Sequence, residues 1–311
     1  MKAQELEALR ALIAQHKRYD VLFGVVGLVA TMVGVVTLLA LFIDLIIDGW
    51  GRLTWEFFTS FPSRRPEEAG ILSSWVGTVL VMLVTMLAAV PMGVAAGVYL
   101  EEYAPRNWVT TLIEINVTNL AGVPSIVYGL LALGLFVYIL DFGESILTAG
   151  LTLALLILPV IIVATREALR AIPTAIREGV YALGATRWQL VSEHLIPYAS
   201  GGILTGVIIG LARAIGETAP VITIGALTFI AFLPPAPFTI DPATGQPAGL
   251  FDWLFSPFTV LPIQMFNWVS RPQPGFILNA AAVGIVIIVA TLAMNALAIW
   301  LRYRIRNKIK W

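Results

Sequence analysis

The sequence lacks cysteine altogether, so disulfide bonds and thiolate metal sites are excluded. It has only two histidines, His16 and His194, and they lie far apart in the chain. A histidine-based metal site is therefore not expected, and catalysis by serine, histidine and aspartate together has few residues to draw on. The formal net charge is zero, which argues against a nucleic-acid partner.

Charged residues are scarce as well. They make up 12% of the 311 residues, whereas a soluble domain contains roughly 25%. Hydrophobic residues account for 59%, and the mean hydropathy is +0.88. A chain with so few charges cannot cover a water-facing surface in the usual way. The composition therefore predicts an all-α protein that crosses a lipid membrane several times.

Six stretches are long and apolar enough to cross a bilayer as helices, which takes about 20 residues. They cover approximately residues 21–47, 72–100, 113–140, 146–165, 201–230 and 277–301. The first is too long for the core of a signal peptide and has no small-residue cleavage site, so we interpret it as a retained span. Pro91 and Pro124 fall inside the second and third stretches, where prolines kink membrane helices.

The basic residues predict the orientation of these spans. With six spans and the N-terminus inside, fourteen of the 19 lysines and arginines fall in cytoplasmic segments and one falls within a span. The four in external segments are Arg52, Arg64, Arg65 and Arg271. Because cytoplasmic loops collect Lys and Arg, both termini are expected in the cytoplasm.

This orientation also divides the rest of the chain. Leucines within residues 1–20 are spaced like the apolar face of a helix, which predicts an interfacial helix on the cytoplasmic surface; a frayed tail is the alternative. The predicted remainder is an external loop at 48–71, a core at 72–301 with a cytoplasmic loop at 166–197 and an external loop at 231–276, and a basic cytoplasmic tail at 302–311.

The cytoplasmic loop has the pattern of two short helices. Pro173 suits a helix start, and Gly184 suits a left-handed turn between the helices. Pro197 is predicted to end the second helix and to restart the chain into the next span. Such a helix pair could dock in a groove on a partner protein, although a plain amphipathic connector would have the same pattern.

Within this loop, EGVYALGATRWQLVSEHLIP resembles the EAA loop of binding-protein-dependent ABC importer permeases. Glu178, Gly184 and Pro197 have the spacing of that pattern, whereas Gly179 and Val180 replace its alanines, and the ending HLIP also departs from it. In that family the loop docks on an ATPase subunit. The resemblance implies that the contacts are made by Glu178, Gly179, Tyr181, Ala182, Gly184, Ala185, Arg187 and Trp188.

Four further stretches, GVAAGVYLEEYAP, NLAGVPSIVYGL, ARAIGETAP and PFTVLPIQMFNW, together resemble the permease subunits of phosphate importers. The resemblance implies an all-α MetI-like bundle in the cell inner membrane. It also implies three partners: a second permease subunit, a dimer of ATPase subunits and an external phosphate-binding protein. The PFTVLPIQ stretch favours one of the two permease types. The other type, or a permease for sulfate or molybdate, remains the alternative.

The sequence contains no G-x-x-x-x-G-K-[ST] motif, so it has no P-loop with which to bind ATP. ATP is therefore expected to bind to the ATPase partner. The chain itself is expected to be neither an enzyme nor a cofactor-binding protein.

Arg213 and Glu217 fall inside the predicted span 201–230, where charges are costly and mark functional sites. Residues four apart on a helix share a face, and Gly216 and Pro220 weaken the helix there. An arginine fork matches phosphate oxygens, and a carboxylate can accept a phosphate O–H that ionised sulfate lacks. The pattern predicts a transport path; a buried ion pair between helices is the alternative.

Other polar residues are weaker candidates for the path. Asn119, Ser125 and Tyr128 lie on either side of Pro124, and Thr218 follows the charged pair. They could line the path, or they could only join helices by hydrogen bonds, which is common in membrane bundles.

Two features near the inner end of the second span have structural interpretations. Gly93 and Gly97 form a G-x-x-x-G pattern that predicts close helix packing. Glu101 and Glu102 are expected to be solvated.

Overall fold

The computed structural model describes residues 2–239 and 249–306, and these contain helices but no β-strand. Within this described part, five helices are long and apolar enough to cross a membrane, and a sharply bent pair makes a sixth if it is counted as one span. The all-α, multi-span architecture predicted from the sequence is confirmed.

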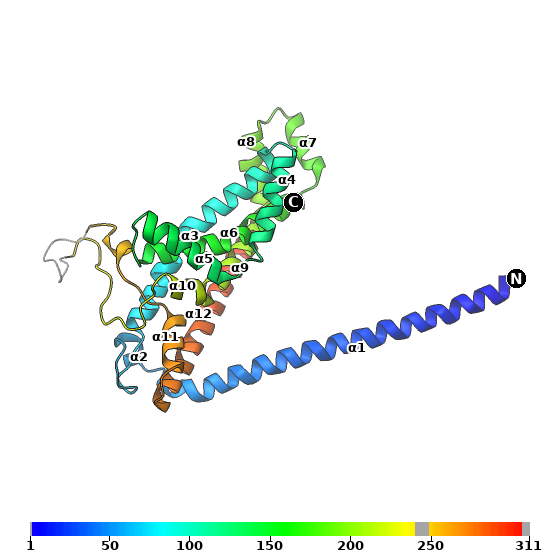
Figure 1. Ribbon diagram of the computed structural model, residues 1–311. Helices are drawn as coiled ribbons and strands as arrows, with labels where there is room; N and C mark the ends of the chain where they lie inside the picture. The colour runs from blue at the N-terminus through cyan, green and yellow to red at the C-terminus, as the bar shows by residue number, and fades with distance from the viewer. Residues whose placement is uncertain (1, 240–248, 307–311) are drawn as a thin grey trace.

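The first helix, α1 (Lys2–Gly49), is one long rod that extends away from the other helices (Figure 1). It meets the bundle near its outer end, where a Cβ on Gly49 would lie 2.6 Å from the backbone of Ala282. No break separates the predicted interfacial helix 1–20 from the predicted span 21–47. The side chains of residues 2–12, 14 and 15 lie outside those that the structure describes.

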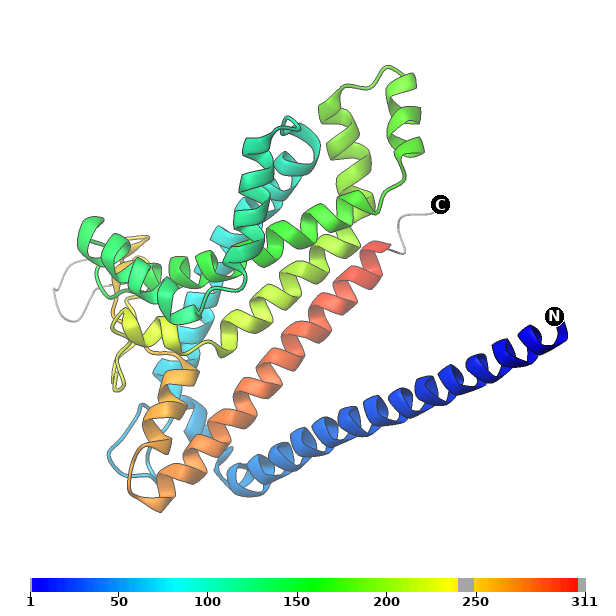
Figure 2. The ribbon, with the colours of Figure 1, turned by 45° about the vertical axis from the view of Figure 1, so that its right-hand side comes forward.

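Four helices make up most of the bundle, and each packs along the next (Figure 2). In packing order they are α3 (Leu72–Val98), α6 (Ile146–Arg170), α9 (Ile196–Gly216) and α12 (Pro274–Arg306). α3 continues into η2 (Tyr99–Tyr103), a wider π-helical turn.

Small residues allow α3 and α6 to approach closely. A Cβ on Gly93 would lie 2.7 Å from the side chain of Ile161, and one on Gly97 would lie 2.7 Å from that of Thr165. Ile161 and Thr165 are both fully buried. The close packing predicted from the G-x-x-x-G pattern is therefore confirmed.

We expect Gly93→Ala to destabilise the bundle by about 1–3 kcal/mol, the usual cost of overpacking, partly offset by the better helix propensity of alanine. The thermal unfolding midpoint of the detergent-solubilised protein measures this effect. Gly34→Ala in α1 is the matched control, because a Cβ there would meet no described atom within 4 Å. Equal unfolding midpoints for the two variants would contradict the expectation.

The third predicted span, 113–140, is broken rather than kinked. It consists of α4 (Trp108–Leu120), then α5 (Ser125–Ala132) continued by the π-helical η3 (Leu133–Ile139), and the two halves meet at 107°. Pro124 has extended backbone angles, with φ −55° and ψ 135°. Because proline lacks an N–H and disfavours helical angles in the residue before it, the helix cannot continue through this point.

The fifth predicted span, 201–230, is also corrected. α9 starts earlier, at Ile196, and ends at Gly216, because Glu217 has an extended backbone with ψ 126°. A separate short helix, α10 (Ala219–Thr223), follows and packs against α5. At this contact a Cβ on Gly129 would collide with Thr223, so the two short helices touch through a glycine.

The loop predicted to be cytoplasmic contains α7 (Thr174–Ala182) and α8 (Arg187–Gln189), joined by a turn in which Gly184 has φ +83°. The predicted helix–turn–helix is thus confirmed. The prediction that Pro197 ends the second helix is wrong. The π-helical η4 (Leu190–Leu195) joins α8 directly to α9, and its wider turn accommodates the proline that follows.

The opposite end of the bundle carries the segments that the sequence predicts to be external. The loop at 48–71 contains η1 (Trp50–Arg52) and α2 (Trp55–Thr59). The described parts of the loop at 231–276 contain η5 (Asp252–Phe255) and α11 (Leu261–Val269), and residues 240–248 lie outside the description. This loop inserts into the bundle: Phe258 is buried, and the Leu261 N–H donates to the Thr78 hydroxyl at 2.9 Å.

Candidate functional site

Arg213 and Glu217 form an ion pair at the outer end of α9. The distance from Arg213 Nε to Glu217 Oε1 is 3.2 Å, although the helix ends between the two residues. The prediction that they share an unbroken helix face is wrong, but the pair forms because Glu217 turns back over the last helical turn. An arginine in this turn also opposes the partial negative charge of the helix C-terminus.

The pair leaves part of the arginine free. Only Nε contacts Glu217, and the two terminal amino groups of Arg213 make no hydrogen bond to any residue that the structure describes. The Arg213 side chain is 37% exposed, against 19% for Glu217. The two terminal amino groups of Arg213 are therefore available to an oxyanion, which an arginine can bind through two parallel hydrogen bonds.

Tyr128 lies close to this pair, on the buried side of α5. Its hydroxyl donates to the Leu120 carbonyl at 2.8 Å and so bridges the break between α4 and α5. Tyr128 and Ala214, the residue that follows Arg213, belong to the same buried core. Because α5 packs against α10, the broken third span lies beside the segment that directly follows the charged pair.

The remaining predicted path residues are spread more widely. Ser125 is half-buried at the start of α5. Thr218 lines an open, mainly apolar cavity of about 590 Å³ bounded by α10, α11 and α12. Asn119 is exposed on α4 and lines a different cavity, which it shares with Arg166. The structure therefore groups Tyr128 with the charged pair but does not place Asn119 there.

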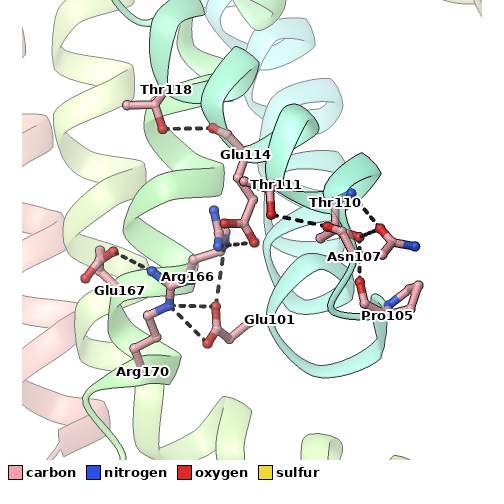
Figure 3. Close-up of polar contacts among 10 residues, drawn as sticks. All are labelled: Glu101, Pro105, Asn107, Thr110, Thr111, Glu114, Thr118, Arg166, Glu167 and Arg170. Atoms are coloured by element: carbon pink, nitrogen blue, oxygen red, sulfur yellow. Dashed lines mark hydrogen bonds and ion pairs between the residues drawn. The ribbon is translucent and has the colours of Figure 1, made fainter.

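A second charged group joins η2, α4 and α6 at the end of the bundle that carries the α7–α8 loop, which we call the inner end; Figure 3 shows its contacts. Arg166 Nη2 lies 2.6 Å from Glu114 Oε1, and Arg166 Nε lies 3.5 Å from Glu101 Oε2. Arg170 Nε donates to both carboxylate oxygens of Glu101, at 2.9 and 3.1 Å. We call Glu101, Glu114, Arg166 and Arg170 the inner charge cluster. The expectation that Glu101 is solvated is wrong.

Glu102 is paired as well, which corrects the same expectation. Its carboxylate accepts from Arg177 of α7, and Arg177 Nη2 also donates to the Leu169 carbonyl at 2.8 Å. The carboxylate of Glu102 is only 7% exposed. This contact fastens α7 to both η2 and α6.

The residues expected to contact an ATPase lie on the outside of the loop. All are exposed except Ala185, which is partly buried: Glu178, Gly179, Tyr181, Ala182, Gly184, Ala185, Arg187 and Trp188. Arg187 stacks over the Tyr103 ring at 5.6 Å, and Trp188 lines an apolar cavity of about 760 Å³ against α3. Among the residues described, no three His, Asp or Glu side chains form a group that could hold a metal ion.

Comparison with known proteins identifies the family. Residues 89–311 match the family model described as "Binding-protein-dependent transport system inner membrane component". The chain belongs to this family. The multi-pass permease fold inferred from the loop motif is therefore confirmed, as is its place among inner-membrane transport components.

Several curated relatives are similar over most of their length. A probable ABC transporter permease protein of Bacillus subtilis, YqgI, is 32% identical over 290 residues, which cover 92% of this chain and 95% of the relative. The phosphate transport system permease protein PstA of Xylella fastidiosa is 30% identical over 268 residues, covering 85% and 86%. The resemblance to phosphate importer permeases seen in the sequence is confirmed.

The fold also resembles a solved transporter. An inward-facing structure of the MetNI methionine ABC transporter aligns with a TM-score of 0.55 and 18% sequence identity, covering 74% of this chain and 93% of that one. At this identity the likeness shows the fold alone, and it agrees with the predicted MetI-like bundle.

Proposed function

We propose that this chain is the PstA-type permease subunit of an ATP-driven inorganic phosphate importer and forms half of its transport path. The observation that carries the proposal is Arg213, whose two terminal amino groups have no hydrogen-bond partner among the described residues and lie at a break in a membrane span. The similarity to PstA proteins supports phosphate as the anion.

The chemistry of the pair suits phosphate. Near neutral pH phosphate is an anion that still carries a proton, so Arg213 can donate to its oxygens while Glu217 accepts from its O–H. The carboxylate also reduces the net attraction, which favours release of the anion on the other side. Sulfate or molybdate is the alternative substrate, but ionised sulfate has no proton to offer Glu217.

The surfaces of the chain support three partners of the kinds named above. A second, PstC-like permease would cover α1, whose apolar side chains, such as Phe23 at 81% exposure, are left open by this chain. A PstB-like ATPase dimer would dock on α7 and α8, and it would bind the ATP, so this chain itself needs no cofactor. A PstS-like binding protein would deliver phosphate at the end that carries α2 and α11.

In the proposed orientation both chain termini would lie in the cytoplasm. The last turns of α12 lie beside the start of α9, with Arg302 Nε 3.6 Å from the position of a Cβ on Gly201, so the end of α12 and the α7–α8 loop are at one end of the bundle (Figure 2). The excess of basic residues in these segments favours the cytoplasm.

Uptake of labelled phosphate into proteoliposomes tests the proposal. The vesicles contain the full complex of this chain with its partner subunits, with ATP on the ATPase side, and excess sulfate is the competitor. We expect phosphate uptake that depends on ATP and is not reduced by sulfate. Uptake that sulfate abolishes, or sulfate transport in place of phosphate, would overturn phosphate as the substrate.

A further inference from the structure

The half-helix α4 is attached to the rest of the chain mainly by polar contacts. None of its side chains is fully buried among the described residues, and only Thr110, Glu114 and Val117 are partly buried. Helices in this bundle otherwise pack through buried apolar residues such as Ile161. Without a buried apolar face, α4 lacks the contribution that normally fixes a helix in place.

The strongest of these contacts is the ion pair between Glu114 of α4 and Arg166 of α6, at 2.6 Å (Figure 3). Arg166 is 7% exposed and Glu114 is 30% exposed. Nε and Nη2 of Arg166 have no well-aligned hydrogen bond to any described residue. Arg166 is therefore held mainly by electrostatic attraction to the carboxylates of Glu114 and Glu101. Removing Glu114 would leave a buried guanidinium with Glu101 as its remaining partner, which is unfavourable.

Space for movement exists on both sides of this pair. A polar cavity of about 400 Å³ separates α4 from α6, and a second of about 580 Å³ lies between α4 and the η2 region. Glu114 and Arg170 line both cavities and therefore form the partition between them. Releasing the partition would join the two spaces at the inner end of the bundle.

The same cluster is connected to the cytoplasmic loop. Arg177 of α7 is paired with Glu102, and the neighbouring residue Glu101 is paired with Arg166 and Arg170. A displacement of α7 therefore pulls on η2, and Glu101 of η2 is paired with Arg166, the arginine that is paired with Glu114 of α4. Each link in this chain of contacts is an ion pair between different helical elements.

We infer that the inner charge cluster is a latch that holds α4 against α6, and that movement of the α7–α8 loop opens it. Arg166 is its central positioning residue. The inference rests on the proposed docking of an ATPase on this loop, but it does not depend on which anion is transported.

The absence of native cysteine in this chain permits a direct test. Thr118→Cys places a thiol on α4 facing the 400 Å³ cavity, and its rate of reaction with a hydrophilic maleimide is measured in the full complex in lipid nanodiscs. We expect the rate to change when ATP and vanadate are added. With Glu114→Gln added, we expect the nucleotide-free rate to rise about tenfold and the nucleotide response to disappear, because the partly buried pair is lost.

Glu167→Gln is the matched control. Glu167 lines the same cavity and carries the same charge, but it is 66% exposed, and its one ion pair among the described residues is with Arg170, at 3.6 Å. Its labelling rates should equal those without the substitution. If Glu114→Gln and Glu167→Gln give equal rates, or if the nucleotide response survives Glu114→Gln, the latch is overturned.

Two substitutions of Arg166 distinguish a latch held by charge from a side chain that is needed only for folding. Arg166→Lys keeps a positive charge near Glu114 and should retain the nucleotide response, whereas Arg166→Met should lose it while the complex still assembles. Loss of the response in both variants, with assembly intact, counts against charge as the holding force. Because labelling requires no phosphate, a complex that responds to ATP but takes up no phosphate would overturn the proposed substrate and leave the latch standing.

Discussion

Arg213→Gln is expected to reduce ATP-dependent phosphate uptake by about 100-fold without preventing assembly of the complex. Glutamine keeps much of the length of the side chain but loses the charge and the two terminal amino groups that face outward. Hydrogen bonds to charged groups contribute about 1.5–3 kcal/mol, and about 1.4 kcal/mol corresponds to a factor of ten, so the loss of two such bonds accounts for this effect. Initial rates of uptake into proteoliposomes are the measurement.

The control for this variant is Arg65→Gln. Arg65 is also an arginine in an ion pair, with Glu68 at 3.0 Å, but its side chain is 75% exposed in the external loop. Exposed pairs of this kind contribute about 0–1 kcal/mol, so uptake should be unchanged. If Arg213→Gln transports as well as Arg65→Gln does, the pair of Arg213 and Glu217 is structural, and Tyr128 and Ser125 become the leading candidates for the path.

Gly184→Val is expected to separate the permease from its ATPase while the membrane spans remain inserted. Gly184 has φ +83°, and a β-branched side chain is strongly disfavoured in this conformation. The turn must therefore change its angles, which reorients α8 relative to α7. We expect about a tenfold loss of ATPase subunit in co-purification, because a strained left-handed residue costs about 1–3 kcal/mol and about 1.4 kcal/mol corresponds to a factor of ten.

Gly143→Val provides the corresponding control at the other end of α6. Gly143 has φ +65° and, like Gly184, no described atom within 4 Å of a Cβ, so the substitution introduces similar backbone strain outside the cytoplasmic loop. Its complex should retain the ATPase subunit. Normal ATPase recruitment by Gly184→Val would refute the docking of an ATPase through this turn.

The sequence predicts the spans well because membrane crossing depends on local composition. A run of about 20 apolar residues is sufficient to recognise a span, whatever it packs against. The turn at Gly184 is predictable for the same reason, since a glycine that interrupts two short helices already indicates a left-handed residue.

Helix ends and bends were predicted less well, because they depend on where particular residues fall within a span. Pro124 was expected to kink one helix, yet the halves meet at 107°. A proline alone does not distinguish a kink from a break, since neighbouring helices can satisfy the backbone groups that it frees. Pro197 shows the reverse case, in which a π-helical turn allowed the helix to continue.

The inner charge cluster was missed because its members are distant in sequence. Glu101 and Arg170 are 69 positions apart, and nothing local to Glu101 indicates a partner. One signal was present: Arg166 and Arg170 are four apart and so share a face of α6, directed at a single region. In contrast, the sequence indicates Arg213 and Glu217 because both lie in one short apolar segment. Only the structure shows that the terminal amino groups of Arg213 have no hydrogen-bond partner among the described residues.

The attachment of α1 at one end gives it leverage. A 48-residue helix is about 72 Å long, and this one crosses the bundle close to Gly49, where its backbone approaches Ala282 without an intervening side chain. A rotation of about 5° at this crossing displaces the far end by about 6 Å, simply from the length of the arm. A subunit that grips α1 along its length can therefore swing through a distance comparable to one helical turn while the packing of α3, α6, α9 and α12 stays intact.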